Sequence, residues 1–316
     1  MGAKNKSNEL KIIRIYDAPV KMVWEAWTDP KKVAKWWGPR GFTITTHSKD
    51  LKPGGHWAYT MHGPDGTNWE NKTIYHEVEK HAKLVYDHGG NDDRPPLFRV
   101  TVLFSEMNGG KTKMDMTMTL PTPEAAEQTR KFIKQASGNS TWDRLAEYLS
   151  DEIDHKEKFV INRTFETDIN TMFEMWTNPQ HFSKWLAPTG FSMEYIRSEI
   201  KPGATTFSMM TNGDIKLYNH IKYLEIEKPH RIVYTTAFVD EKENRSHHPA
   251  LPVWPQIMLT TIQLAEEAPG ETRVTVTWEP QNASPEETAI FVQHKPSMTM
   301  GWTGSFDKLE ALLDQR

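Results

Sequence analysis

The 316-residue sequence contains no cysteine. This absence excludes disulfide bonds, thiolate metal sites and cysteine nucleophiles, and it fits a reducing cytoplasm. No run approaches the roughly 18 apolar residues that a membrane-spanning helix needs, and the polar start, Met1 to Glu9, lacks an apolar signal segment. The 38 basic and 42 acidic side chains give a net charge of −4, so no strong field attracts nucleic acid or an anionic membrane. We therefore expect a globular cytoplasmic protein without a nucleic-acid or membrane partner.

A long repeat dominates what the sequence does contain. At an offset of 149 residues, ten of the 29 positions from Arg14 to Phe42 are identical. Matching pairs include Trp27-Thr28 with Trp176-Thr177, Lys35-Trp36 with Lys184-Trp185, and Lys52-Pro53-Gly54 with Lys201-Pro202-Gly203. Solenoid repeats run to about 20–50 residues, whereas this period has the size of a whole domain. The chain is therefore predicted to be a tandem duplication, with domains at residues 8–152 and 156–316.

Each copy has the pattern of a strand, two short helices, about six strands and a long helix. In the first copy, residues 10–16 are rich in β-branched side chains, and residues 20–27 place apolar side chains at helical spacing. Between Gly41 and Leu120, short runs with a period of two are separated by turn signals, which predicts antiparallel strands. The final helix is predicted from an apolar stripe made of Phe132, Ile133, Ala136, Trp142, Leu145 and Leu149. This order predicts an α+β fold in which the last helix covers the sheet.

Several motifs of the first copy form a specific combination. They are Asp17-Ala18-Pro19, Val23-Trp24-Glu25-Ala26-Trp27-Thr28-Asp29-Pro30, Lys35-Trp36-Trp37-Gly38-Pro39, Lys52-Pro53-Gly54-Gly55 and Gly63-Pro64-Asp65-Gly66. This combination resembles the family of activator-of-heat-shock-protein-90-ATPase homologues, which belongs to the START-like (SRPBCC) helix-grip superfamily. The second copy keeps part of the pattern, including Trp176-Thr177-Asn178-Pro179. A Gly-Trp pair that members often carry in the last helix appears as Gly301-Trp302 but reads Ser137-Gly138 in the first copy.

The resemblance implies two tandem helix-grip domains, each a curved antiparallel sheet around a long C-terminal helix with two short helices. It also implies a deep apolar cavity between the sheet and the last helix. Relatives use that cavity for lipids, polyketides, hormones and other hydrophobic compounds, and some relatives are polyketide aromatases or cyclases. The chaperone activators that this sequence resembles carry a separate N-terminal chaperone-binding domain, whereas about six residues precede the first expected strand here. A chaperone partner is therefore not expected.

The high aromatic content, with 12 Trp, 13 Phe and 9 Tyr, supplies candidates for ligand-binding residues. On a helix-grip plan the expected lining residues are Trp24, Trp27, Trp36, Phe42, Trp57, Tyr59, Met114, Met116, Met118 and Trp142 in the first copy, and Trp176, Trp185, Phe207, Trp278 and Trp302 in the second. The methionine stripe is the best local case, because flexible and polarizable side chains suit an adaptable pocket. The same residues would also suit a plain hydrophobic core, and the sequence leaves both interpretations open.

Two of the 13 histidines are candidates for a catalytic acid or base. By period two, His76 shares a face with apolar neighbours and could enter the cavity, and His220 is a similar candidate in the second copy. His56 and His62 alternate with the aromatic face of their strand, so they are expected to point away from it. The sequence has no Ser-His-Asp grouping, His-Glu-x-x-His motif or phosphate-binding glycine loop. Catalysis therefore stays open, and no cofactor is expected.

The largest difference between the copies is a longer polar segment, Asp240 to Gln256, which contains His247 and His248. Adjacent side chains in an irregular loop seldom converge on one metal ion, and no second cluster has ligand spacing, so no metal site is expected. The prolines around Trp254 instead favour a stiffened lid or an interdomain contact. We expect this segment to be dispensable for folding but to matter for access to the second cavity.

Three functions follow as hypotheses. The main one is a binding module that sequesters or carries a small hydrophobic or aromatic molecule. The first alternative is a polyketide cyclase-like, aromatase-like or hydrolytic enzyme that uses an acid or base in the cavity, and the second is a protein-interaction role akin to chaperone regulation. A buried His or Glu beside an open cavity would favour the enzyme. A closed core with a large exposed apolar patch would favour the interaction role.

Overall fold

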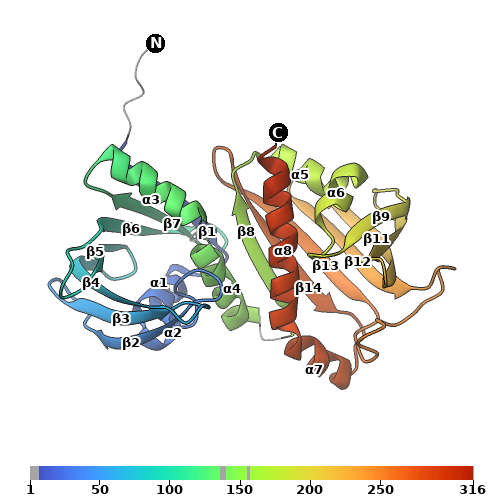
Figure 1. Cartoon of the computed structure of the whole chain (residues 1–316), viewed down its shortest axis with the longest axis horizontal. Coiled ribbons are helices and arrows are strands. Elements are labelled where there is room, and N and C mark those ends of the chain that lie inside the picture. The colour runs from blue at the N-terminus through green and yellow to red at the C-terminus, as the bar shows by residue number, and fades with distance from the viewer. Residues whose placement is uncertain (1–6, 136–139, 155–156, 316) are drawn as a thin grey trace, which may run out of the picture. The chain divides into compact units, whose positions relative to one another are not determined.

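The computed structural model describes residues 7–135, 140–154 and 157–315 (Figure 1). The chain divides into two compact units, Met1–Ile153 and Asp154–Arg316, which we call the first and second units and describe separately. Each unit has a seven-stranded sheet in which all paired neighbours run antiparallel. The predicted α+β fold is therefore confirmed in both copies. No helix of the described residues is long and apolar enough to cross a membrane.

The first unit has the predicted order of elements. These are β1 (Glu9–Tyr16), α1 (Val20–Thr28), α2 (Pro30–Val33), β2 (Thr43–Lys49), β3 (His56–His62), β4 (Asn68–Glu79), β5 (Lys83–Gly90), β6 (Phe98–Met107), β7 (Lys111–Thr119), α3 (Pro123–Gln135) and α4 (Ser140–Asp154). The sheet order is β1-β7-β6-β5-β4-β3-β2, so the first and last strands are neighbours and β2 forms an edge. One face of this sheet, which we call the inner face, carries the hydrophobic core.

The two short helices are set by local chemistry. The apolar side chains of α1, among them Trp24 and Trp27, are buried in the core. The Asp29 side chain caps α2 by accepting hydrogen bonds from the backbone N–H groups of Lys31 at 2.7 Å and Lys32 at 3.2 Å. Proline occupies the first position of α2, where its missing N–H costs no helical hydrogen bond. The chain is thereby turned twice before it enters β2.

Helix α4 is tied to the loop that follows α2. The Arg144 guanidinium donates hydrogen bonds to the backbone carbonyls of Gly38 at 2.7 Å, Pro39 at 2.9 Å and Phe42 at 3.1 Å. Three carbonyl acceptors on one cation fix the helix in rotation as well as in position. Trp142, on the same helix, is therefore held against the core.

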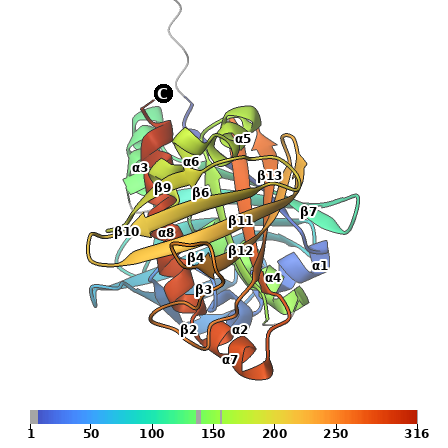
Figure 2. The same cartoon turned by 90° about the vertical axis from the view of Figure 1, so that its right-hand side faces the viewer.

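The second unit repeats this order. Its elements are β8 (Phe159–Phe165), α5 (Ile169–Thr177), α6 (Pro179–Trp185), β9 (Ser192–Arg197), β10 (Thr205–Thr211), β11 (Lys216–Glu227), β12 (Arg231–Val239), β13 (Met258–Ala268), β14 (Glu271–Pro280), α7 (Pro285–Gln293) and α8 (Lys295–Leu313). The sheet order, β8-β14-β13-β12-β11-β10-β9, matches that of the first unit. Figure 2 views this sheet from its outer face, with α8 behind the strands.

The terminal helix differs in detail from its prediction. In the first unit the described residues of this region form two helices, α3 and α4; Ala136 lies outside the described residues. Trp142, Leu145 and Leu149 of α4 are buried as predicted, but Phe132 of α3 is 67 % exposed. The stripe therefore draws on both α3 and α4. Ile133 of α3 packs against the core together with the α4 residues, whereas Phe132 does not. In the second unit α8 has 19 residues and follows the shorter α7.

The segment between β12 and β13 is anchored rather than loose. Trp254 is 9 % exposed, lies in the core cluster of the second unit and packs against Phe291 of α7 with ring centroids 5.7 Å apart. Its ring also meets His294 edge-on at 6.1 Å. The expectation that the segment is dispensable for folding conflicts with this burial, because deleting it would open the core beside α7.

Candidate functional site

The interior of the first unit is filled by indole rings from several elements. Trp27 of α1 stacks on Trp142 of α4, with centroids 5.7 Å apart and planes inclined by 11°. Trp37 meets Trp27 edge-on at 5.6 Å and Trp57 of β3 at 5.3 Å. Trp36, which is fully buried, donates its indole N–H to a backbone carbonyl of α1 at 3.1 Å. The short helices, β3 and α4 thus meet in one aromatic cluster.

Nine of the ten residues predicted to line the first interior are buried in one core. They are Trp24, Trp27, Trp36, Trp57, Tyr59, Met114, Met116, Met118 and Trp142. The three methionines alternate along β7, which pairs with both β1 and β6, so their side chains share the inner face. The exception is Phe42, which is partly exposed and packs against Trp69 at 5.6 Å. Its side chain follows the loop rather than the inner face of a strand.

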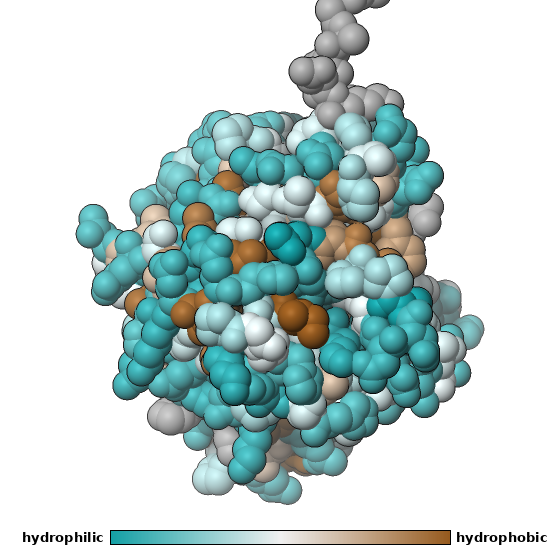
Figure 3. All heavy atoms as spheres, turned by 90° about the vertical axis from the view of Figure 1, so that its left-hand side faces the viewer, coloured by the Kyte–Doolittle hydropathy of each residue, from teal (hydrophilic) through white to brown (hydrophobic). Residues whose placement is uncertain are grey.

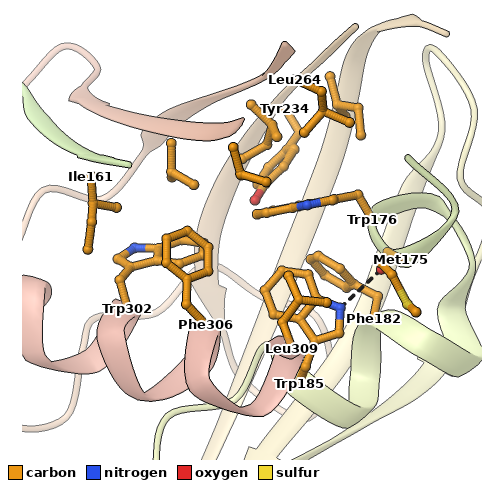
Figure 4. Close-up of a cluster of buried hydrophobic side chains, with 14 of the residues drawn as sticks. Ile161, Met175, Trp176, Phe182, Trp185, Tyr234, Leu264, Trp302, Phe306 and Leu309 are labelled. Atoms are coloured by element: carbon orange, nitrogen blue, oxygen red, sulfur yellow. Dashed lines mark hydrogen bonds between the residues drawn. The ribbon is translucent and has the colours of Figure 1, made fainter. Parts of the chain in front are cut away.

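Three of the five residues predicted for the second interior lie in its core. Trp176 of α5 meets Trp185 of α6 edge-on at 4.6 Å and stacks near Trp302 of α8 at 6.1 Å (Figure 4). Trp185 donates its indole N–H to the Met175 carbonyl at 3.1 Å, the dashed contact in Figure 4. Trp278 of β14 is partly buried and packs against this core.

Phe207, the fifth, is not part of this interior. Its neighbours along β10, Thr206 and Ser208, are fully buried, and by the period of two Phe207 points to the opposite, outer face. There its ring stacks on Tyr218 at 5.8 Å, and the Arg197 guanidinium lies 6.0 Å from it. The prediction was wrong because it was based on residue type alone. Phe207 is the counterpart of Ala58, whereas the inner residues of β3 are Trp57 and Tyr59 on either side of it.

Each interior holds a group of three buried tyrosines. In the first unit Tyr75 of β4 and Tyr86 of β5 are direct cross-strand partners, and Tyr59 completes the group. Burial raises the pKa of each of these hydroxyls, and their mutual proximity adds to the increase for Tyr75 and Tyr86. The tyrosines are therefore neutral hydrogen-bonding groups at physiological pH. Tyr59 Oη accepts a hydrogen bond from the Trp37 indole at 3.1 Å.

The second unit has an equivalent group, but its third tyrosine comes from another strand. Tyr223 of β11 and Tyr234 of β12 are cross-strand partners, with ring centroids 5.7 Å apart, and Tyr195 of β9 lies beside them. At the offset of 149 residues, Tyr195 is the counterpart of Thr46. Burial raises the pKa of all three hydroxyls, as in the first unit.

Several polar atoms inside the second unit form no complete hydrogen bond among the described residues, although two pairs of hydroxyls lie close together, Tyr195 with Tyr223 and Tyr234 with Thr260. They are the hydroxyls of Tyr195, Ser208, Tyr223 and Thr260 and the indole N–H groups of Trp176 and Trp278. Ser208 and Thr260 are fully buried. Buried polar atoms are normally paired, and each one left without a partner costs about 1–3 kcal/mol. An otherwise apolar interior with a few convergent polar groups is the usual composition of a small-molecule site.

A histidine that the sequence analysis did not select lies inside the first unit. Leu84, Tyr86 and His88 share the inner face of β5, and the His88 ring lies 6.2 Å from Trp37 and 5.2 Å from Phe98. Its Nδ1 atom is buried and has no hydrogen-bond partner in the part of the chain that the structure describes. Burial lowers the pKa of His88 to about 4, so the ring is neutral at pH 7. Counting in steps of two from Tyr86 would have found it.

The expected position of His76 in the cavity is wrong. Tyr75 faces the interior, so its neighbour His76 faces outward, and a β-bulge after Tyr75 then makes Val78 the next inward residue. His76 is exposed on the outer face, where its Nε2 atom lies 2.7 Å from the Asp87 carboxylate. Arg99 donates to the same carboxylate at 2.8 Å, and with His76 it lowers the pKa of Asp87.

His220 also lies on an outer face. Its Nε2 atom is 2.8 Å from a Glu243 oxygen, and its ring meets Phe207 edge-on at 5.6 Å. Arg197 donates two hydrogen bonds to Glu243, at 2.8 and 2.7 Å, and this pairing, with His220, lowers the pKa of Glu243 to about 2. Neither candidate histidine is therefore brought to an interior.

Lys49 is an unusual cation in the first unit. It is the last residue of β2, and its Nζ atom lies 4.1 Å from the centre of the Trp57 ring and donates to the Trp27 carbonyl at 3.0 Å. No carboxylate pairs with it among the described contacts. Burial lowers the pKa of Lys49 to about 7. Nothing in the local sequence indicates this burial, because a lysine at the end of a strand is usually solvated.

A surface pocket of about 450 Å³ lies where β12 leads into residues Asp240 to Gln256, which we call the inserted segment. It is lined by residues 216–218, 238–242, 246–247 and 249. Phe238 belongs to this lining and also packs against the core of the second unit. The pocket is therefore adjacent to the interior.

Metal ligands do not cluster in the described ranges: no group of three or more His, Asp or Glu side chains there could hold an ion. His247 lines the surface pocket, and the His248 ring packs edge-on against Phe238 at 5.0 Å. His56 and His62 point away from the interior, as predicted, and bond to hydroxyl groups of the neighbouring strand.

Comparison with known proteins identifies the family. The sequence profile of the family described as activator of Hsp90 ATPase homolog 1-like protein matches residues 17–150 and 166–314. A search of curated proteins finds no match. Several solved structures align over nearly their whole length with about half of this chain.

One is a solution structure of a protein from Arthrobacter aurescens, 25% identical, covering 49% of this chain and 94% of its own, with a TM-score of 0.43. Another, from Staphylococcus epidermidis, is also 25% identical and covers 49% of this chain and 97% of its own, with a TM-score of 0.42. The di-domain ARO/CYC protein BexL from the BE-7585A biosynthetic pathway is 13% identical and covers 96% of this chain and 97% of its own, with a TM-score of 0.39. Because the family profile matches both units and most of the sequence, the chain belongs to the activator of Hsp90 ATPase homolog 1-like family.

Proposed function

We propose that the chain is a cytoplasmic binding module that sequesters or carries a small hydrophobic or aromatic molecule within its helix-grip units. The observation that carries this proposal is the composition of the interiors, where aromatic and methionine side chains surround polar atoms that form no complete hydrogen bond among the described residues. A ligand would supply the missing hydrogen bonds and contact the aromatic surfaces.

The methionine side chains of β7 support an adaptable site in the first unit. Met114, Met116 and Met118 are between 0 and 5 % exposed and belong to the same core as the indole cluster. Methionine is unbranched and polarizable, so it changes rotamer at low cost and makes favourable contacts with aromatic rings. Such a strand can reshape around a ligand without disturbing the sheet.

Native mass spectrometry of the protein purified from its own host tests the proposal directly. A co-purified small molecule of defined mass is the expected result. A second test measures an apolar fluorescent probe against the wild-type protein and Met116→Trp, which fills the first interior and costs about 1–3 kcal/mol of stability from overpacking. We expect Met116→Trp to weaken the binding that arises in the first unit. Absence of any co-purified molecule, together with no probe site in either protein, would show that the interiors are plain core.

The position of His88 supports a second candidate function, an enzyme that uses an interior acid or base. The ring is neutral, faces the aromatic interior and leaves Nδ1 free among the described residues, which a general base requires. His88→Thr, which introduces the residue found two positions after Tyr234 in the second unit, tests it. If a candidate substrate still binds but is no longer turned over, the enzyme is favoured.

A protein-interaction role has less support. On the face shown in Figure 3, hydrophobic side chains occur as small separate groups among hydrophilic ones. A docking surface for another protein usually presents a contiguous apolar patch of several hundred Å². This face therefore offers no argument for a chaperone partner.

A further inference from the structure

Five polar atoms that form no complete hydrogen bond among the described residues lie along the inner face of the second sheet, two of them, Tyr195 and Tyr223, close to one another. They belong to Tyr195 of β9, Ser208 of β10, Tyr223 of β11, Thr260 of β13 and Trp278 of β14. The strand register places them in two rows. Trp278 faces Thr260, Thr260 faces Tyr234, and Tyr234 faces Tyr223. Tyr195 faces Ser208 in the second row.

The first unit satisfies two of the corresponding positions, Thr46 and Tyr59, internally. There the Trp37 indole donates to Tyr59, and the Trp57 indole donates to Thr46 at 3.1 Å. Their counterparts in the second unit carry no indole, because Leu186 replaces Trp37 and Thr206 replaces Trp57.

The second unit has also gained polar atoms where the first is apolar. Thr260 faces Trp278 across β13 and β14, in the place where Val100 faces Met118 across β6 and β7. A hydroxyl and an indole N–H thus replace two purely apolar side chains. Lost donors and added polar atoms both leave the second interior with unused hydrogen-bonding capacity among its described residues. Where Tyr195 pairs with Tyr223, or Tyr234 with Thr260, each pair still keeps one hydroxyl proton and free lone pairs for a ligand.

We propose that the second interior binds a small aromatic molecule that carries oxygen, a phenol or an aromatic carbonyl compound, through the hydroxyls of Ser208, Thr260 and Tyr223. This inference rests on the proposed function and specifies its chemistry and its unit. A hydroxyl both donates and accepts, so these groups pair with a phenol or with a carbonyl oxygen. A site built to hydrogen-bond such an oxygen rejects the analogue that lacks it, since its own buried groups would stay unpaired.

The surface pocket supplies the route to this site. The row that contains Tyr195 and Ser208 continues through Asn219 to Phe238, by direct cross-strand pairing. Phe238 lines the pocket of about 450 Å³, and the inserted segment forms part of the same lining. A ligand entering past Phe238 would therefore meet the Ser208 row first.

The test uses the full chain and two probes that differ in one group, 2-naphthol and 2-methylnaphthalene, with affinities measured by isothermal titration calorimetry. Wild-type protein should bind 2-naphthol at least about tenfold more tightly, as expected for a site that reads a hydroxyl. Thr260→Val places the residue of the first unit in the second and keeps the shape of the side chain. It should remove most of the preference and leave 2-methylnaphthalene binding unchanged.

Two variants that each place a larger side chain in one interior identify the unit that binds the probe. Ser208→Tyr, again the residue of the first unit, should abolish 2-naphthol binding, whereas Met116→Trp in the first unit should leave it intact. Thermal melts check that the variants fold. If the larger side chain prevents folding, Ser208→Ala replaces Ser208→Tyr. The Ser208→Ala variant should bind 2-naphthol with a smaller preference over 2-methylnaphthalene.

Each contrary outcome has a distinct meaning. Equal affinity for the two probes, or a preference that survives both Thr260→Val and Ser208→Ala, overturns this inference and indicates that buried water satisfies the hydroxyls. Loss of binding in Met116→Trp but not in Ser208→Tyr also overturns it, because the site then lies in the first unit while the proposed function stands. If neither probe binds any of these proteins, the proposed function fails as well.

Discussion

Tyr195 of β9 faces Ser208 of β10, and this pair is the Thr46–Tyr59 pair of the first unit with the tyrosine moved to the other strand. In both units the tyrosine joins a cross-strand pair of buried tyrosines on the next strands. The two copies have diverged at most positions, yet each retains one large phenol and one small hydroxyl at this place. Both units therefore keep a group of three tyrosines, although the third tyrosine comes from β3 in the first unit and from β9 in the second.

The exchange predicts strong coupling between the two positions. Tyr59→Ser alone removes a buried ring and the acceptor of the Trp37 indole, and we expect it to cost about 3–5 kcal/mol of unfolding free energy. Adding Thr46→Tyr rebuilds the arrangement of the second unit and should recover about 1–3 kcal/mol, the usual range for residues in contact. Urea denaturation of the two single variants and the double variant measures the coupling. Additive effects would show that the exchange is incidental.

The burial of Trp254 predicts that the inserted segment contributes to stability. Trp254→Ala removes a ring that is 9 % exposed and packs on Phe291, so it should cost about 3–5 kcal/mol. Phe132→Ala, at a position 67 % exposed, is the control and should change stability by less than about 0.5 kcal/mol. Equal, small effects in thermal or urea unfolding would restore the view that the segment is dispensable.

Sequence reasoning succeeded where long-range patterns are strong. The offset of 149 residues and the order of strand, helix and turn signals predicted two α+β units and antiparallel sheets, because hydrophobic period and turn chemistry specify elements locally. It failed where one residue shifts the period. Ile74 and His76 lie on the outer face, and a bulge after Tyr75 brings Val78 to the inner face, so the three residues do not share one face. Nothing in the local sequence indicates this bulge.

The candidate site was predictable in part for the same reason. Buried aromatic residues such as Trp27 and Trp142 could be assigned to the interior by type and spacing. His88 and Lys49 could not, because their burial depends on rings contributed by distant segments, Trp37 and Phe98 for the first and Trp57 for the second. The environment that changes the pKa of a group is built only when the sheet forms.

His88 predicts a loss of stability on acidification. Its pKa is about 4 in the folded protein, against 6.5 for the ordinary value, so between these values the unfolded chain binds a proton that the native protein does not. Stability therefore falls as the pH drops from 6.5 toward 4. His88→Thr removes this contribution. Between pH 7 and pH 4.5 the variant should therefore lose less unfolding free energy than the wild type, by up to about 3 kcal/mol. Denaturant titrations at both pH values measure this, and identical losses would contradict it.

Lys49 predicts a pH dependence in a different window. Its pKa is about 7 in the folded protein, against 10.5 for the ordinary value, so between pH 7 and 10.5 the unfolded chain holds more protons and stability rises with pH. Below pH 7 both states are protonated and the fold bears the whole cost of the buried charge. Lys49→Met should therefore stabilise the protein most at pH 6, by at most a few kcal/mol since each pKa unit is worth about 1.4 kcal/mol, and its advantage should shrink by pH 9.5.

The neighbouring Lys52 provides the matched control for this measurement. Its side chain is 68 % exposed and pairs with Asp50 at 2.9 Å on the surface. Exposed ion pairs contribute between about 0 and 1 kcal/mol, so Lys52→Met should change the unfolding free energy little at either pH. Urea titrations of the wild type and both variants at pH 6 and pH 9.5 separate the two cases. A Lys49→Met effect that is the same at both values would show that the amine is solvated, and that the Trp57 ring and the Trp27 carbonyl do not hold it in an apolar site.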